Sequence, residues 1–116
     1  MTSVEDVQAG DFDEVKRGRG VAAVEFWVRS CGECQKFRPV YEQLPEVYGG
    51  RIRFLRMNML KSIENLRLAE ELGVEETPTT VFFCDGEAVG EIVGHRPLEE
   101  AVEEIESILK NTNGCP

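Results

Sequence analysis

The stretch EFWVRSCGECQKF, residues 25–37, decides the fold and raises the functional question, because an apolar run ends there in two cysteines. Cys31 and Cys34 are two residues apart and follow the run VAAVEFWV, residues 21–28. That run is short, β-branched and aromatic, which predicts a strand buried on both faces. The two cysteines could close a structural disulfide, hold part of a metal site or exchange electrons.

A helical pattern begins directly after this strand. Ser30 and Glu33 form the S-x-x-E pattern of a capping box, which predicts Ser30 as the N-cap and Cys31 as the first helical residue. Cys34 then lies one turn further along the same face, near enough to Cys31 for a disulfide. Cys31 also lies at the positive end of the helix dipole, which favours the reactive thiolate. The more covered Cys34 would attack the mixed disulfide and release the partner.

Helices and strands alternate outward from this segment. The apolar spacing predicts helices over residues 34–48, 62–72 and 97–109, and strands over residues 51–59, 79–83 and 88–94. Residues 11–18 are expected to form a further short helix. Pro39 should kink the second helix, and Asp85-Gly86 predicts a hairpin turn between the last two strands. This order predicts an α/β fold with a central mixed sheet of four to five strands and helices on both faces.

Length and charge limit the classes of function. The 116 residues predict a single domain over residues 1–110 and a flexible C-terminal tail over residues 111–116. The net charge of −9 argues against binding to nucleic acid or to an anionic membrane, because phosphate groups would repel the chain. Basic residues gather locally around the cysteines, and we interpret them as solvated faces of helices and strands.

The cysteines outside the central motif give little sign of a second site. The N-terminal segment has no secretory signal pattern, so we expect a cytoplasmic protein in a reducing environment. Cys84 ends an apolar strand and is interpreted as a half-buried free thiol, and Cys115 as an incidental residue of the tail. His95 is expected at the surface.

The three uses of Cys31 and Cys34 are not equally favoured. A strand that leads into C-x-x-C at a helix start is the redox arrangement. Zinc needs four ligands, and Cys84, His95 and Cys115 form no ligand-spaced pair, so we expect no metal site. An inert structural disulfide is also less expected, because a reducing cytosol would open it.

Two segments resemble the thioredoxin family. EFWVRSCGECQKFRP resembles the family's segment with an acidic residue, an aromatic residue, Trp and Cys-Gly-Pro-Cys, and VEETPTTVFFCDGEAVGEIVG resembles its segment from the cis-proline to the hairpin and the terminal glycine. The resemblance runs from about residue 4 to residue 110. It implies the thioredoxin fold and a thiol–disulfide oxidoreductase without bound cofactor. Such an enzyme reduces disulfides in target proteins, is re-reduced by an external reductase, and is expected to be a monomer.

The resemblance also assigns roles to residues. Cys31 matches the nucleophile, Cys34 the resolving thiol, and Glu25 the buried acid that helps to move a proton at the resolving cysteine. Glu25 could instead be an ordinary strand carboxylate, but an acid inside an apolar strand is costly unless it is paired or used.

Four further residues match the family's substrate-binding rim. They are Trp27, which packs beside the site, Thr77 with Pro78, and Gly94. The resemblance implies a cis bond before Pro78, although the sequence by itself does not, because only about 5–6% of X–Pro bonds in folded proteins are cis. Trp27 could equally be a core aromatic residue, and Gly94 only a turn.

The sequence departs from the family pattern at Ser30, Glu33 and Thr77, where Trp, Pro and often Ile are usual. The charge of Glu33 disfavours a thiolate at Cys31, while the helix end, Lys36 and Arg38 favour it. We expect a reduction potential near that of thioredoxin, about −270 mV. The alternatives are a glutaredoxin-like or disulfide-isomerase-like activity, or a non-catalytic thioredoxin-fold binding module.

Overall fold

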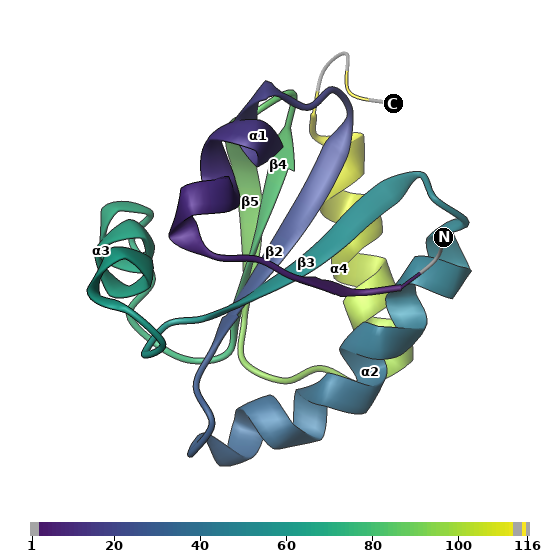
Figure 1. Cartoon of the computed structure of the whole chain (residues 1–116). Coiled ribbons are helices and arrows are strands. Elements are labelled where there is room, and N and C mark those ends of the chain that lie inside the picture. Colours follow the sequence, from purple (N-terminus) through teal and green to yellow (C-terminus); the bar gives the residue numbers. More distant parts are fainter. Residues whose placement is uncertain (1–2, 113–114, 116) are drawn as a thin grey trace.

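The computed structural model describes residues 3–112 and 115, and a five-stranded sheet lies at its centre (Figure 1). The strand order is β1-β3-β2-β4-β5. The elements are β1 (Glu5–Asp6), a 3-10 turn (Ala9–Asp11), α1 (Phe12–Arg17), β2 (Val21–Trp27), α2 (Gly32–Tyr48), β3 (Ile52–Asn58), α3 (Ile63–Glu71), β4 (Thr79–Cys84), β5 (Glu87–Val93) and α4 (Leu98–Lys110).

The sheet is mixed, as the order of elements predicted. Strands β1, β3 and β2 run parallel to one another, whereas β4 pairs antiparallel with both β2 and β5. The sequence did not predict β1, because a strand of two exposed residues carries no apolar period. With β1 included, the sheet reaches the upper end of the predicted four to five strands.

Helices cover both faces of the sheet, which confirms the predicted layers (Figure 1). On one face, α2 and α4 contribute Phe37, Tyr41, Leu44, Tyr48, Ala101 and Ile105 to a buried cluster. On the other face, α1 and α3 contribute Phe12, Val15 and Ala69 to a second cluster. The sheet therefore separates two apolar cores, and α2, which follows the cysteine motif, lies over only one of them.

Alternation along β2 and β3 decides which polar side chains point into the core under α2. Side chains of a strand point alternately to its two faces, so Glu25 lies on the same face as Val21 and Ala23, in the cluster under α2. Arg56 of β3 pairs directly with Glu25 in the parallel register. An acid and a base thus lie side by side beneath the start of α2.

Helix α2 begins one residue later than the capping-box pattern predicted. Cys31 is the N-cap, with φ −92° and ψ 116°, and its sulfur accepts the amide hydrogen of Cys34. The predicted capping box of Ser30 and Glu33 is therefore wrong, because a cysteine sulfur takes the position expected for a hydroxyl. Pro39 lies inside the helix as expected, and the ribbon of α2 bends along its length (Figure 1).

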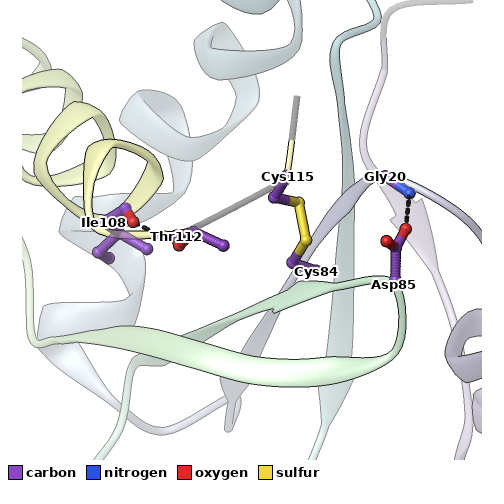
Figure 2. Close-up of a disulfide and its surroundings, with 6 residues drawn as sticks. All are labelled: Gly20, Cys84, Asp85, Ile108, Thr112 and Cys115. Carbon is purple, nitrogen blue, oxygen red and sulfur yellow. Dashed lines mark hydrogen bonds between the residues drawn. A yellow bond between two sulfur atoms is a disulfide. The ribbon is translucent and has the colours of Figure 1, made fainter.

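The β4–β5 hairpin is anchored to the loop before β2. Its turn consists of Asp85 and Gly86, both with positive φ, as the Asp-Gly sequence predicted. The amide of Gly20 donates to the Asp85 carboxylate over 2.6 Å (Figure 2). The amide of Asp85 donates in turn to the carbonyl oxygen of Gly20 over 2.9 Å. This double contact joins the hairpin to the segment between α1 and β2.

The prediction that Cys84 is a free thiol is wrong. A disulfide joins Cys84, at the end of β4, to Cys115 beyond α4, with the two Cα atoms 6.0 Å apart (Figure 2). Proximity in the fold, which no local pattern reveals, brings two cysteines 31 positions apart together. Of the predicted flexible tail, residues 113, 114 and 116 lie outside the residues described.

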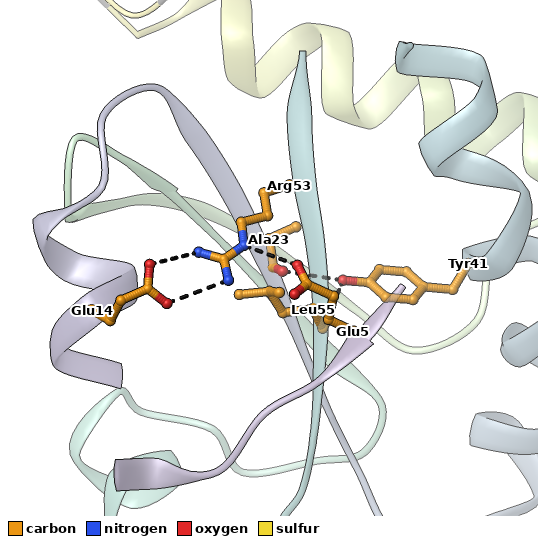
Figure 3. A network of polar contacts seen from close by, with 6 residues as sticks. All are labelled: Glu5, Glu14, Ala23, Tyr41, Arg53 and Leu55. Carbon is orange, nitrogen blue, oxygen red and sulfur yellow. Dashed lines mark hydrogen bonds and ion pairs between the residues drawn. The ribbon is translucent and has the colours of Figure 1, made fainter. Parts of the chain in front are cut away.

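Polar contacts fasten the outer elements to β3 (Figure 3). Arg53 of β3 donates to Glu5 of β1 and, through both terminal nitrogens, to Glu14 of α1, at 3.0–3.3 Å. On the opposite face, the hydroxyl of Tyr41 in α2 donates to the carbonyl oxygen of Leu55 over 2.6 Å. The strand that carries Arg56 is therefore held from both sides.

Candidate active site

Cys31 and Cys34 lie together between the carboxyl end of β2 and the amino end of α2. Both are thiols, Cys31 half-buried and Cys34 only 4% exposed. The amide nitrogen of Cys34 lies 3.1 Å from the sulfur of Cys31, which closes the first turn of the helix through that sulfur. The more exposed thiol is thus the one that receives backbone hydrogen bonds.

The two thiols have opposite pKa shifts. Burial alone would raise the pKa of Cys31, but hydrogen bonds from the Cys34 thiol, the Thr77 side chain and the amides of Cys34 and Glu33 outweigh it and lower that pKa. Burial and the hydrogen bond to Cys31 raise the pKa of Cys34 to about 12. This arrangement makes Cys31 the more readily ionised thiol of the pair and disfavours the thiolate of Cys34.

The segment around Pro78 lies against Cys31. The Cys31 thiol donates to the carbonyl oxygen of Thr77 over 3.3 Å, and the Thr77–Pro78 bond is cis. The amide of Gly94 donates to the carbonyl oxygen of Pro78 over 2.7 Å. Thr77 thus contacts the Cys31 thiol and Gly94 contacts the adjoining Pro78, and all three are among the residues that the sequence singled out.

Glu25 is buried in β2, the strand that leads into this site. Its side chain is 1% exposed, and neither carboxylate oxygen has a hydrogen-bond partner among the residues described. Burial raises the pKa of Glu25 from 4.5 to about 7, although nearby Arg56 lowers it in part. The carboxylate oxygen lies 3.8 Å from Nε of Arg56, too far for a hydrogen bond.

Sequence reasoning missed Arg56. The residue is 6% exposed, and its guanidinium lies 4.2 Å from the ring centroid of Trp27, a distance typical of a cation–π contact. Arg56 shares the alternation of Ile52 and Phe54, whereas Arg51 and Arg53 lie on the opposite phase. The position of Arg56 in this alternation could have identified it from the sequence, because it places the side chain on the buried face of the strand.

Glu33 lies in a different environment from the one expected. Its carboxylate forms an exposed ion pair with Lys36, at 3.2 Å, one turn along α2. Hydrogen-bond donors lower the pKa of Cys31, and Glu33 takes part through its backbone amide. The Glu33 amide therefore favours the Cys31 thiolate, and the influence of the Glu33 charge stays a prediction.

The residues considered for zinc do not gather. In residues 3–112 and 115, no three His, Cys, Asp or Glu side chains lie close enough to hold a metal ion. Cys84 and Cys115 are bonded to each other, and His95 is half-buried, with its ring 6.0 Å from that of Phe37. In the same part of the chain, no helix is long and apolar enough to cross a membrane.

Sequence comparison places these features among known proteins. A family model described as Thioredoxin matches residues 3–107. The chain is 38% identical over 90 residues to a thioredoxin of Staphylococcus saprophyticus, covering 78% of this chain and 84% of that protein. It is 36% identical over 103 residues to a thioredoxin of Staphylococcus epidermidis, covering 89% and 95%.

Solved structures give the same result for the fold. Thioredoxin f from spinach chloroplast superposes with a TM-score of 0.81 at 27% identity, over 93% of this chain and 95% of that one. A thioredoxin of Malassezia sympodialis superposes with a TM-score of 0.77 at 27% identity, over 95% and 91%. The likeness thus extends over nearly the whole chain, including the cysteine motif and the segment around Pro78.

Proposed function

The chain belongs to the thioredoxin family and is a thiol–disulfide oxidoreductase, and we propose that it reduces disulfides in partner proteins with Cys31 as the nucleophile. The observation that carries this proposal is the pair of opposite pKa shifts at one helix start. A lowered pKa supplies the attacking thiolate, and a raised pKa keeps the second thiol in reserve.

The reaction needs two thiol–disulfide exchanges. The Cys31 thiolate attacks one sulfur of the partner's disulfide, forming a mixed disulfide and releasing the partner's other sulfur as a thiolate. Cys34 then loses its proton and attacks the sulfur of Cys31, which expels the partner's second thiolate. Two electrons pass to the partner, and the chain is left with a Cys31–Cys34 disulfide.

We assign to Glu25 the acceptance of the proton from Cys34, directly or through water. A thiol with a pKa of about 12 needs a base at neutral pH, and a carboxyl with a pKa of about 7 is suited to take and return a proton there. Arg56 is a positioning residue in this proposal, since it lies between the Glu25 carboxylate and the Trp27 ring.

We assign substrate binding to the rim around Cys31. Trp27, Thr77, Pro78 and Gly94 belong to it, and this is supported by the contacts that join Cys31 to Thr77 and Pro78 to Gly94. A partner chain that brings its disulfide to Cys31 must pass over this backbone. The partners are disulfide-containing proteins, and an external disulfide reductase restores the dithiol.

The proposal includes a monomer that works in the cytoplasm, where a reductase keeps it reduced. In that compartment the Cys84–Cys115 disulfide persists only if its own potential lies below that of the surrounding thiol pool, about −220 to −320 mV. In this proposal the Cys31–Cys34 couple is kept reduced while the Cys84–Cys115 bond stays oxidised. The two bonds must therefore have different reduction potentials.

The decisive experiment is an equilibrium redox titration of the Cys31–Cys34 couple. We would use metal-free protein in which Cys84→Ser and Cys115→Ser remove the second disulfide, with Cys31→Ser in the same background as the control. Thiol alkylation counted by mass reports the redox state. We expect one two-electron transition near −270 mV, absent from the control.

Other outcomes of this titration distinguish the alternatives. A potential nearer −120 mV would favour an oxidase or isomerase role, because such couples oxidise rather than reduce. A chain without any reversible transition would contradict the redox proposal and leave the non-catalytic binding module.

A further inference from the structure

A cavity of about 240 Å³ lies beside Cys34, and the proposed reaction does not require a ligand in it. Its wall is formed by the end of β2 and the following loop, the first two turns of α2, and β3. Three of its lining side chains are arginines, namely Arg29, Arg38 and Arg56. Three cations around one hollow are notable on a chain whose net charge is −9.

The arginines are only partly neutralised. Arg38 forms an exposed ion pair with Glu42 at 3.2 Å, and Arg56 lies 3.8 Å from the Glu25 carboxylate. Among the residues described, Arg29 makes no ion pair. The cavity is thus lined with more positive than negative charge, and a water-filled hollow of that kind attracts anions.

Two side chains that line the cavity carry a buried donor without a partner. Nε of Arg56 and Nε1 of Trp27 are both shielded from solvent and make no hydrogen bond within the described part of the chain. Arg56 as a whole is 94% buried, since it is 6% exposed. Buried donors in folded proteins are nearly always satisfied, so Arg56 and Trp27 bring unused donor capacity to the wall of the cavity.

We propose that this cavity is a binding site for an oxyanion, that is, a carboxylate or phosphate group, held by Arg56 with Arg29 and Arg38 at its edge. The planar guanidinium group matches two oxygens of such an anion and forms the stronger, charge-assisted hydrogen bonds. The anion is either a free small molecule or an acidic side chain of a partner protein, since the chemistry of recognition is the same.

An occupied site would act on the neighbouring thiol. Cys34 lines the cavity, so a bound negative charge disfavours its thiolate. The mixed disulfide at Cys31 would then be resolved more slowly while the anion is present. This consequence rests on the proposed function, whereas binding itself does not.

Trp27 provides a direct reporter of binding. It is the single tryptophan of the chain and lines the cavity, so its fluorescence, excited selectively, reports on binding here, and the cavity variants below separate this from binding at the rim around Cys31. Reduced protein is titrated with inorganic phosphate at constant ionic strength, with chloride as the replaced ion. A second titration uses a peptide with two aspartates, matched to the same peptide with two asparagines.

The variant Arg29→Gln with Arg38→Gln tests the site, because both side chains are exposed and the core is untouched. Arg17→Gln is the matched control, since Arg17 is exposed and lies away from the cavity. We expect a saturable fluorescence change that the control retains. The double variant should bind at least about tenfold more weakly, as loss of charged hydrogen bonds implies.

The two probes separate the sources of the anion. Saturation by phosphate supports a free oxyanion, and saturation by the aspartate peptide alone supports an acidic side chain of a partner. Saturation by neither probe, or equal affinity in the double variant, would overturn the site. Since no arm depends on electron transfer, failure of the redox proposal would leave this result standing.

Discussion

At the scale of single residues, Glu25 and Arg56 form a buried pair of an acid and a base. Their shortest contact is 3.8 Å, and neither carboxylate oxygen of Glu25 finds a hydrogen-bond donor in the described chain. Attraction to Arg56 therefore compensates only in part for desolvation of the carboxylate. Folding accordingly favours the protonated acid, and this gives Glu25 a measurable effect on stability.

We expect the free energy of unfolding to fall as the pH rises from about 4.5 to about 7. Over this range the native state holds a proton at Glu25 that the unfolded chain has lost, so a higher pH favours unfolding. The change from 4.5 to about 7 corresponds to about 3 kcal/mol. Glu25→Gln should abolish this part of the slope in urea denaturation at a series of pH values.

Glu46→Gln is the matched control for that experiment, because Glu46 is an exposed acid on α2. It should leave the slope of the parent protein in place. If Glu25→Gln and the parent show the same dependence between pH 4.5 and pH 7, Glu25 does not titrate as its burial implies.

At position 33 the charge and the backbone can be separated. Glu33→Gln keeps the amide that helps to lower the pKa of Cys31, whereas Glu33→Pro removes it. We expect Glu33→Pro to make the couple more reducing by about 30 mV, since one hydrogen bond to a charged group contributes about 1.5 kcal/mol. Glu33→Gln should change the reduction potential much less. A larger shift for Glu33→Gln would show that the charge of the Glu33 carboxylate affects the potential.

The residues of the site were predictable to different degrees. Glu25 stood out because an acid inside an apolar strand needs a reason, and the structure does bury it. Arg56 was missed because several arginines alternate in the same strand and only its phase distinguishes it. The cap at Cys31 was missed because a sulfur is not among the usual capping groups.

At the scale of elements, the turn of the β4–β5 hairpin packs closely against α1. A Cβ atom at Gly86 would overlap the carbonyl oxygen of Lys16, whereas a Cβ at Gly50 would meet nothing within 4 Å. The two glycines have nearly equal φ, 90° and 89°, so they share the same backbone penalty for a side chain. The difference between them is the contact with α1.

We therefore expect Gly86→Ala to destabilise the protein by about 1–3 kcal/mol more than Gly50→Ala. Both substitutions include the left-handed cost of about 1–2 kcal/mol. Chemical denaturation of the two variants measures the difference. Equal losses would mean that α1 moves away from the hairpin without cost.

Regular apolar spacing made most elements predictable. Very short elements, and elements that depend on contacts with distant parts of the chain, could not be predicted in this way. The four helices and the strands from β2 to β5 follow from their spacing, Gly-rich ends and the Asp-Gly turn. Strand β1 has two residues and depends on pairing with β3 and on the contact of Glu5 with Arg53. Such an element exists only once its neighbours are in place.

At the scale of the whole molecule, the Cys84–Cys115 disulfide ties the end of α4 to the sheet. It joins positions 31 residues apart, so it encloses β5 and α4 in a covalent loop. In the chain-entropy account, such a loop stabilises mainly by restricting the unfolded state. The sequence could not pair these cysteines, because nothing local indicates where the chain beyond α4 lies.

Removal of this bond should lower the free energy of unfolding by about 2–4 kcal/mol. Cys115→Ser, Cys84→Ser and the double variant should all show the same loss by thermal or chemical denaturation of oxidised protein. Reduction of the parent protein should remove the difference from the variants. If the two single variants lose different amounts of unfolding free energy, the loss would instead come from the packing of Cys84.

The covalent loop also sets how far the molecule can be stretched. When a chain is pulled by its two ends, the residues between Cys84 and Cys115 carry no tension while the bond is closed, although 31 positions separate its ends. Their extended length is about 100 Å, which stays hidden in every force–extension trace of the oxidised chain. The same length is released when the bond is reduced, so the reach of an unfolded chain under load records the redox state of a bond distant from the active cysteines.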